Sequence, residues 1–99
     1  MKWADYIITA VKFKKEKRHI EQVKLRKDEG EKLSAEQIHS RQDVVSAIGK
    51  KVSFVTAYKK DNEWKKGDDV EVVIINNTQF IRTGGDRIEE DNLGELPEF

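Results

Sequence analysis

Residues 70–82 have the sequence VEVVIINNTQFIR, which decides the fold class. In residues 70–75, apolar side chains at alternate positions predict a β-strand that directs one face into the core. Asn76 and Asn77 predict a two-residue turn, because asparagine adopts positive φ more easily than most residues. Residues 78–82 then form the returning strand. Two strands joined by so short a turn must be antiparallel, so we predict a mainly antiparallel sheet.

Three other segments show the apolar alternation of strands: residues 3–13, 20–26 and 52–58. The first is apolar on both faces, which predicts a central place in the sheet or a place beneath a helix. Its alternation puts Ile7 and Val11 on one face and Ile8 on the other. A charged turn over residues 14–18 joins the first two segments into a hairpin, and we predict a polar turn over residues 59–69.

The helix has two candidate starts, which are the capping boxes that begin at Ser34 and at Ser40. The second is followed by an apolar stripe at helical spacing, formed by Val44, Val45 and Ile48. Gly49 then predicts the end of that helix. Residues 33–39 are either extended or an extra helical turn. The predicted order of elements is ββαβββ.

The chain has 99 residues, of which 36% are apolar and 38% are charged. Such a length predicts a single domain over residues 1–99, and the apolar runs distinguish it from a disordered chain. We predict a charged loop at residues 27–33 and an irregular tail at residues 83–99. The apolar side chains of the tail are Leu93, Leu96 and Phe99. We expect them to hold the tail in a hydrophobic groove of a small α+β domain with one short helix.

The sequence contains no cysteine, which excludes disulfides, thiolate metal sites and cysteine nucleophiles. No stretch is apolar over the length that a membrane span requires. The N-terminal segment carries Asp5 and lacks the apolar core of a signal peptide. We therefore predict a cytoplasmic protein with no membrane partner.

Charge is unevenly distributed along the chain, although the formal net charge is zero. Residues 1–66 contain 17 Lys and Arg against 10 Asp and Glu, a net charge of +7. Residues 67–99 contain 2 and 9, a net charge of −7. Either a basic surface meets an acidic partner, or the two parts neutralise each other within one fold. We favour the second interpretation because it needs no partner.

Four segments together carry a family likeness: SRQDVV at residues 40–45, SFVTAY at 53–58, FIRT at 80–83 and DNLGELP at 91–97. In these segments the chain resembles the bacterial family of the domain of unknown function 3892. The likeness covers nearly the whole chain, and its C-terminal pattern is the most specific part. The charged insertion near residues 27–33 departs from shorter members. The resemblance implies a small single domain of unassigned activity, and it transfers no catalytic residue.

Arg82, Thr83, Asp91 and Asn92 are the candidate ligand-binding residues. An arginine, a hydroxyl and a carboxylate brought together by the tail could hold a polar small molecule. Alternatively, Arg82 pairs with Asp91 to fasten the tail, and Asn92 caps a turn. Turn and capping chemistry explains these residue types fully, so we favour the structural interpretation.

The candidate nucleic-acid-binding residues are Lys12, Lys14, Lys15, Lys17, Arg18, Trp64, Lys65 and Lys66. The ring of Trp64 could stack on a base while neighbouring lysines meet phosphates. Alternatively, Trp64 folds back over the edge of the core. Asp61 and Glu63 in the same segment favour the second interpretation.

The sequence shows no set of residues arranged for catalysis. Its two histidines, His19 and His39, do not stand at a metal-ligand spacing from each other. Gly84-Gly85 lacks the other residues of a phosphate-binding loop. We therefore expect no metal, no cofactor and no enzymatic activity.

We predict a non-catalytic binding or structural module that uses its sheet surface or an edge strand. The expected partner is a protein or a second copy of the chain. Nucleic-acid binding by the basic first two-thirds with Trp64 is the first alternative. Binding of a polar small ligand near Arg82 and the tail is the second.

Overall fold

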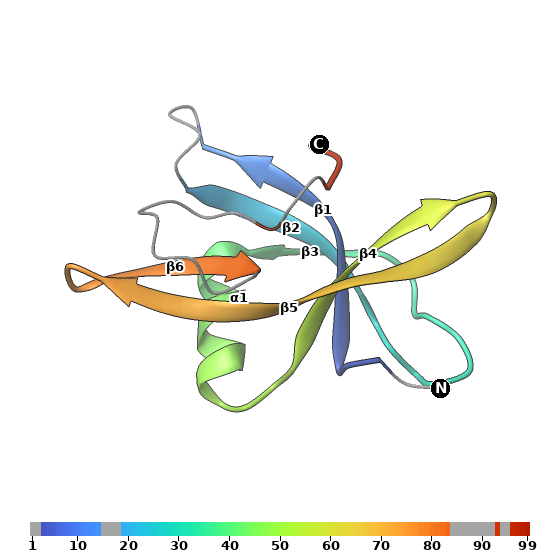
Figure 1. Cartoon of the computed structure of the whole chain (residues 1–99), viewed down its shortest axis with the longest axis horizontal. Helices are drawn as coiled ribbons and strands as arrows, with labels where there is room; N and C mark the ends of the chain where they lie inside the picture. Colours follow the sequence, from blue (N-terminus) through green and yellow to red (C-terminus); the bar gives the residue numbers. More distant parts are fainter. Residues whose placement is uncertain (1–2, 15–18, 84–92, 94–95) are drawn as a thin grey trace.

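The computed structural model describes residues 3–14, 19–83, 93 and 96–99. Within these residues the chain forms β1 (Tyr6–Phe13), β2 (Ile20–Lys27), β3 (Gln37–Ser40), α1 (Arg41–Gly49), β4 (Phe54–Lys60), β5 (Glu63–Ile75) and β6 (Thr78–Thr83), as Figure 1 shows. The six strands make one sheet in the order β3-β2-β1-β4-β5-β6. Neighbouring strands are antiparallel except for β1 and β4, which are parallel. The predicted α+β class with a mainly antiparallel sheet is confirmed.

The predicted order ββαβββ is wrong in one element, because a further strand precedes the helix. Residues 33–39, for which the sequence allowed two conformations, are not helical, and β3 begins at Gln37. Ile38 of β3 lies opposite Lys24 of β2 at the edge of the sheet. One apolar side chain in four residues is too weak a pattern to predict a strand. This strand forms because β2 offers unpaired backbone groups along that edge.

The polar turn predicted over residues 59–69 is also wrong. The turn consists of Asp61 and Asn62, which both have positive φ (53° and 65°), and β4 and β5 pair on either side of it. Figure 1 shows β5 running across the whole molecule from this hairpin to the β5–β6 turn. The turn at Asn76 and Asn77 is confirmed, with φ of 51° and 64°.

A bulge near Thr9 divides β1 into two halves. Simple alternation predicts that Ile7 and Val11 share a face, but the register of β1 against β2 shifts between Ile8 and Ala10. An extra residue in one strand reverses the direction of the side chains that follow it. Ile8 and Val11 therefore enter one apolar cluster and Ile7 enters another. The central place of this strand, between β2 and β4, is confirmed.

Two apolar clusters occupy the two faces of the sheet. The helix-side cluster consists of Ile8, Val11, Ile20, Val23, Leu25, Val44, Val45, Phe54, Val70, Ile81 and Leu93. The tryptophan-side cluster consists of Ala4, Ile7, Val55 and Ala57, bordered by Trp3, Leu33 and Trp64. Helix α1 packs on the first face and contacts β2, β3 and β5. In the described part of the chain no helix covers the second face.

The helix begins as predicted. The Oγ atom of Ser40 accepts a hydrogen bond from the backbone N–H of Asp43 at 3.1 Å, which satisfies one of the free donors of the first turn. The helix ends at Gly49, also as predicted, although the residue with positive φ is Lys51 (68°). With nine residues, α1 is too short to cross a membrane, and the described residues contain no other helix.

The described residues of the tail lie against β1 and the core. Leu93 is 3% exposed within the helix-side cluster, and Leu96 packs against that cluster. The backbone N–H of Phe99 donates to the carbonyl oxygen of Val11 at 3.0 Å, and that of Val11 donates to residue 97 at 2.9 Å. The expected burial of Phe99 is wrong, because its ring is 37% exposed. Backbone pairing holds this residue at the edge of β1, where its ring lies outside the groove.

Candidate binding surfaces

The candidate ligand residues Arg82 and Thr83 do not face a common ligand. Arg82 lies in β6 opposite Glu71, and its side chain is only 1% exposed. Thr83 is the next residue in the same strand, so its side chain points to the opposite face. Asp91 and Asn92 lie outside the described residues. A guanidinium group so deeply buried offers little surface to a ligand from solvent.

The candidate nucleic-acid residues fall into two separate groups in the described structure. Lys12 and Lys14 are exposed at the end of β1, whereas Trp64, Lys65 and Lys66 lie in the β4–β5 hairpin. Figure 1 shows these two ends of the sheet on opposite sides of the molecule. Three further members, Lys15, Lys17 and Arg18, lie outside the described residues. The part of the chain that is described does not join the two groups into one basic surface.

Trp64 lies half-buried on the tryptophan side of the sheet. The Cζ atom of Arg26 is 5.7 Å from the centroid of its ring, and the Nζ atom of Lys59 is 5.5 Å from it. Both cations are close enough for a cation–π interaction, which extends to about 6 Å. A nucleic-acid base that stacked on Trp64 would therefore compete with these side chains for the ring.

Arg26 fastens the segment that precedes β3 to this side of the sheet. Its Nη1 donates to the carbonyl oxygen of Ser34 at 3.1 Å, and its Nη2 is 3.6 Å from the carboxylate of Glu36. Glu36 also pairs with the Nζ of Lys24 at 3.2 Å. Lys24 and Arg26 therefore share one acid, Glu36, which reduces the positive potential that phosphates would meet. A depression of about 350 Å³ lies beside Arg26 and Trp3.

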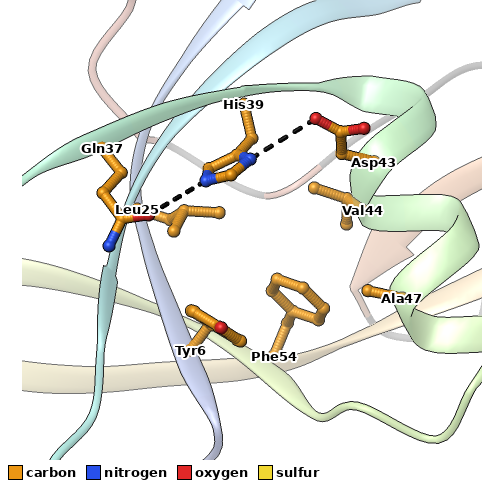
Figure 2. A pocket seen from close by; sticks show the side chains of 8 residues that line it. All are labelled: Tyr6, Leu25, Gln37, His39, Asp43, Val44, Ala47 and Phe54. Carbon is orange, nitrogen blue, oxygen red and sulfur yellow. Dashed lines mark hydrogen bonds and ion pairs between the residues drawn. The ribbon is translucent and has the colours of Figure 1, made fainter.

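A mostly apolar cavity of about 360 Å³ opens on the helix side of the sheet (Figure 2). Its lining residues are Tyr6, Leu25, Gln37, His39, Asp43, Val44, Ala47 and Phe54. We call this cavity the His39 pocket. Leu25, Val44 and Phe54 belong to the buried core and form its inner surface. The ring of Tyr6 stacks on that of Phe54, with 5.5 Å between the centroids and an angle of 22° between the planes.

The rim of the His39 pocket carries three polar side chains, of which His39 contacts the other two. The Nε2 atom of His39 is 3.0 Å from Oε1 of Gln37, and its Nδ1 atom is 3.4 Å from Oδ2 of Asp43. Gln37 and His39 are two residues apart in β3, so they point to the same side. Asp43 lies in the first turn of α1, which brings its carboxylate back toward the imidazole. Figure 2 shows the imidazole facing the two aromatic rings across the cavity.

The chain is similar to a family of known sequences. The model of the family described as "Protein of unknown function (DUF3892)" matches residues 7–97. The chain belongs to this family. No curated protein and no solved structure gave a significant match. The matched range of the DUF3892 domain contains the lining residues of the His39 pocket except Tyr6, which directly precedes it.

Within the described residues of this DUF3892 domain, no group of three or more His, Cys, Asp or Glu side chains could hold a metal ion. His39 and Asp43 are in contact at the mouth of the cavity, with 3.4 Å between Nδ1 and Oδ2. That pair can orient a polar group of a bound molecule while the apolar inner surface covers the rest of it.

The His39 pocket of the DUF3892 domain was not predicted from the sequence. Its residues come from β1, β2, β3, β4 and α1, which meet only after the sheet has formed. One signal was present, because His39 and Asp43 are four residues apart and flank the helix cap at Ser40. Without the conformation of residues 33–39, however, the direction of the histidine could not be derived.

Proposed function

We propose that this DUF3892 domain is a non-catalytic binding module that holds a small ligand in the His39 pocket. The observation that carries the proposal is the cavity of about 360 Å³ with an apolar inner surface and a polar rim. Small-molecule sites are clefts of about 300–1,000 Å³ that combine apolar walls with a few polar groups that fix the orientation of the ligand. This proposal differs from the polar small ligand expected near Arg82, both in its site and in the apolar inner surface that the ligand would contact.

The apolar surface of the cavity supports the proposal. Leu25, Val44 and Phe54 form its inner surface but are themselves buried, so the apolar groups that a ligand can cover lie mainly on the half-buried Tyr6 and Ala47. Ala47 of α1 has a small side chain, which leaves room between the helix and the sheet. Removing apolar surface from water is favourable by about 25 cal/mol per Å², so a ligand that covers the exposed parts of Tyr6 and Ala47 gains affinity.

An amide NMR titration with indole tests this function. We expect shifts confined to the residues around the His39 pocket. Ala47→Leu fills the cavity and should abolish those shifts. Ser46→Leu is the matched control, because Ser46 is an exposed residue of the same helix and does not line the cavity. If millimolar indole produces no localised shifts in the wild-type domain, the proposal is wrong.

A protein partner or a second copy at the edge strand β3 is the second candidate. Ile38 of this strand is 54% exposed and lies opposite Lys24. The exposed ring of Phe99 lies 4.8 Å from the Nζ of Lys24. An edge strand with an exposed isoleucine offers backbone groups and apolar area for strand addition. Light scattering over a range of concentrations tests self-association, which Ile38→Lys should reduce. A strict monomer would exclude the second copy.

Nucleic-acid binding has less support, because the ring of Trp64 already contacts Arg26 and Lys59. A titration with a mixed single-stranded oligonucleotide at low and moderate salt tests it, and shifts at Trp64 that fade with salt would support it. Binding of a polar ligand at Arg82 has the least support, because that side chain is buried. We also propose a cytoplasmic location, which is supported by the absence of cysteine from the sequence.

A further inference from the structure

The inner surface of the His39 pocket suits a flat ring. The rings of Tyr6 and Phe54 are nearly parallel, at an angle of 22°. Figure 2 shows them on one side of the cavity, with Leu25 and the imidazole facing them. Aromatic rings pack favourably against other rings in offset-stacked or edge-on contacts. The pocket therefore favours a ligand with an aromatic body over one covered with hydroxyl groups, which would lose hydrogen bonds to water on this surface.

The rim of the pocket presents acceptor oxygens beside one imidazole, His39, which is cationic only when it is protonated. Asp43 is the one carboxylate among the described lining residues, and none of them is lysine or arginine. The contact of Asp43 Oδ2 with His39 Nδ1 is 3.4 Å long. A good N–H···O hydrogen bond measures about 2.7–3.2 Å, so an N–H group of a ligand can approach this carboxylate more closely than the imidazole does. The amide oxygen of Gln37 is a second acceptor at the same rim.

We infer that the His39 pocket takes an aromatic amine, an assignment that rests on the proposed small-ligand function. The ring of the ligand lies against Tyr6 and Phe54, and its protonated amine reaches the carboxylate of Asp43. An aromatic acid in the same position brings a second negative charge to Asp43, with no lysine or arginine among the described lining residues to balance it. The charge at the rim therefore selects amines over acids of the same shape.

Three ligands with the same ring separate the contribution of the ring from that of the charge. Indole has no charged group, tryptamine adds an ammonium group, and indole-3-acetate adds a carboxylate. Dissociation constants come from amide NMR titrations at low ionic strength. We expect tryptamine to bind about 1.5-fold to fivefold more tightly than indole, which is the range for a solvent-exposed ion pair. Indole-3-acetate should bind more weakly than indole.

Two variants complete the experiment. Asp43→Asn should abolish the preference for tryptamine over indole, which is the ratio of two affinities measured in the same variant. Asp69→Asn is the matched control, because Asp69 is an exposed acid of β5 that does not line the pocket, and it should keep the ranking. Equal affinities for the three ligands, or tighter binding of indole-3-acetate, would overturn the inference while the proposed function stands. If none of the three ligands binds, the inference and the proposed small-ligand function are both overturned.

Discussion

The two faces of the sheet differ in what covers them. The helix-side cluster is covered by α1 and by Leu93 of the tail, and eleven of the described residues are buried in it. The tryptophan-side cluster has four buried residues, and Trp3, Leu33 and Trp64 pack around it as partly buried residues. Because hydrophobic stabilisation grows with the apolar area removed from water, the first face should contribute most of the stability. The same face also contains the His39 pocket, since a helix laid on a sheet leaves space where its side chains are small.

Leu93→Ala should have the largest effect. Leu93 is 3% exposed in the helix-side cluster, and truncation of a buried leucine leaves a cavity that costs about 3 kcal/mol. Urea denaturation followed by circular dichroism measures the loss of unfolding free energy. Phe99→Ala is the control on the same tail, and its exposed ring predicts a loss of about 1 kcal/mol or less. Equal losses in the two variants would show that the tail does not complete the core.

Gly67→Ala should have the second-largest effect on the unfolding free energy. Gly67 lies where β5 passes from the hairpin to the core. A Cβ atom there would collide with Oγ1 of Thr56 and lie 3.0 Å from the carbonyl oxygen of Thr56. The same hydroxyl accepts a hydrogen bond from the backbone N–H of Asp68 at 3.0 Å. We expect a loss of about 2 kcal/mol from overpacking, measured by thermal denaturation. Gly49→Ala is the control, since a Cβ there meets no atom within 4 Å and alanine favours the helix.

Trp64→Ala tests the tryptophan side directly. The side chain is half-buried and packs against a small cluster, so we expect a loss of about 1.5 kcal/mol, less than for Leu93→Ala. Trp64→Phe keeps an aromatic ring beside Arg26 and Lys59 and should lose less than half as much. Chemical denaturation measures both variants. A loss for Trp64→Ala larger than that for Leu93→Ala would reverse the ranking of the two faces.

Ser40→Ala should have the smallest of these effects, about 1 kcal/mol. It removes the hydroxyl that accepts from the backbone N–H of Asp43 and leaves the packing of α1 unchanged. Ser46→Ala, on the exposed side of the helix, is the control and should change the unfolding free energy by less than about 0.5 kcal/mol. A null result for Ser40→Ala would mean that packing against the sheet alone sets the start of the helix.

Features that depend on neighbouring residues were predictable from the sequence. The turn at Asn76 and Asn77 and the helix cap at Ser40 are each decided within a few residues, by backbone preference or by one hydrogen bond. The outer part of the β4–β5 hairpin, which was predicted as a polar turn over residues 59–69, escaped prediction for the opposite reason. Its strands extend beyond the core, so residues such as Trp64 and Lys65 lack the apolar alternation that marks a strand with a buried face.

Features that depend on distant residues were not predictable. Ile38 is in a strand because β3 pairs with β2, where Lys24 lies opposite it, and the bulge near Thr9 places Ile7 and Val11 on opposite faces of the sheet. A shift of one residue reverses every side chain beyond it, so an error at one position moves a whole segment to the wrong cluster. The candidate site followed the same rule, since Trp64 was selected for its chemistry and His39 was considered only as a metal ligand.

The sequence by itself determined the α+β class, most of the strands and the helix, because alternation, turn residues and caps act over short distances. The tertiary structure decided which strands are neighbours, which face each side chain occupies and where a cavity remains. The physical reason is that pairing and packing join segments far apart in the chain. The partners His39 and Asp43 are close in sequence, yet the aromatic rings across the cavity from the imidazole come from β1 and β4.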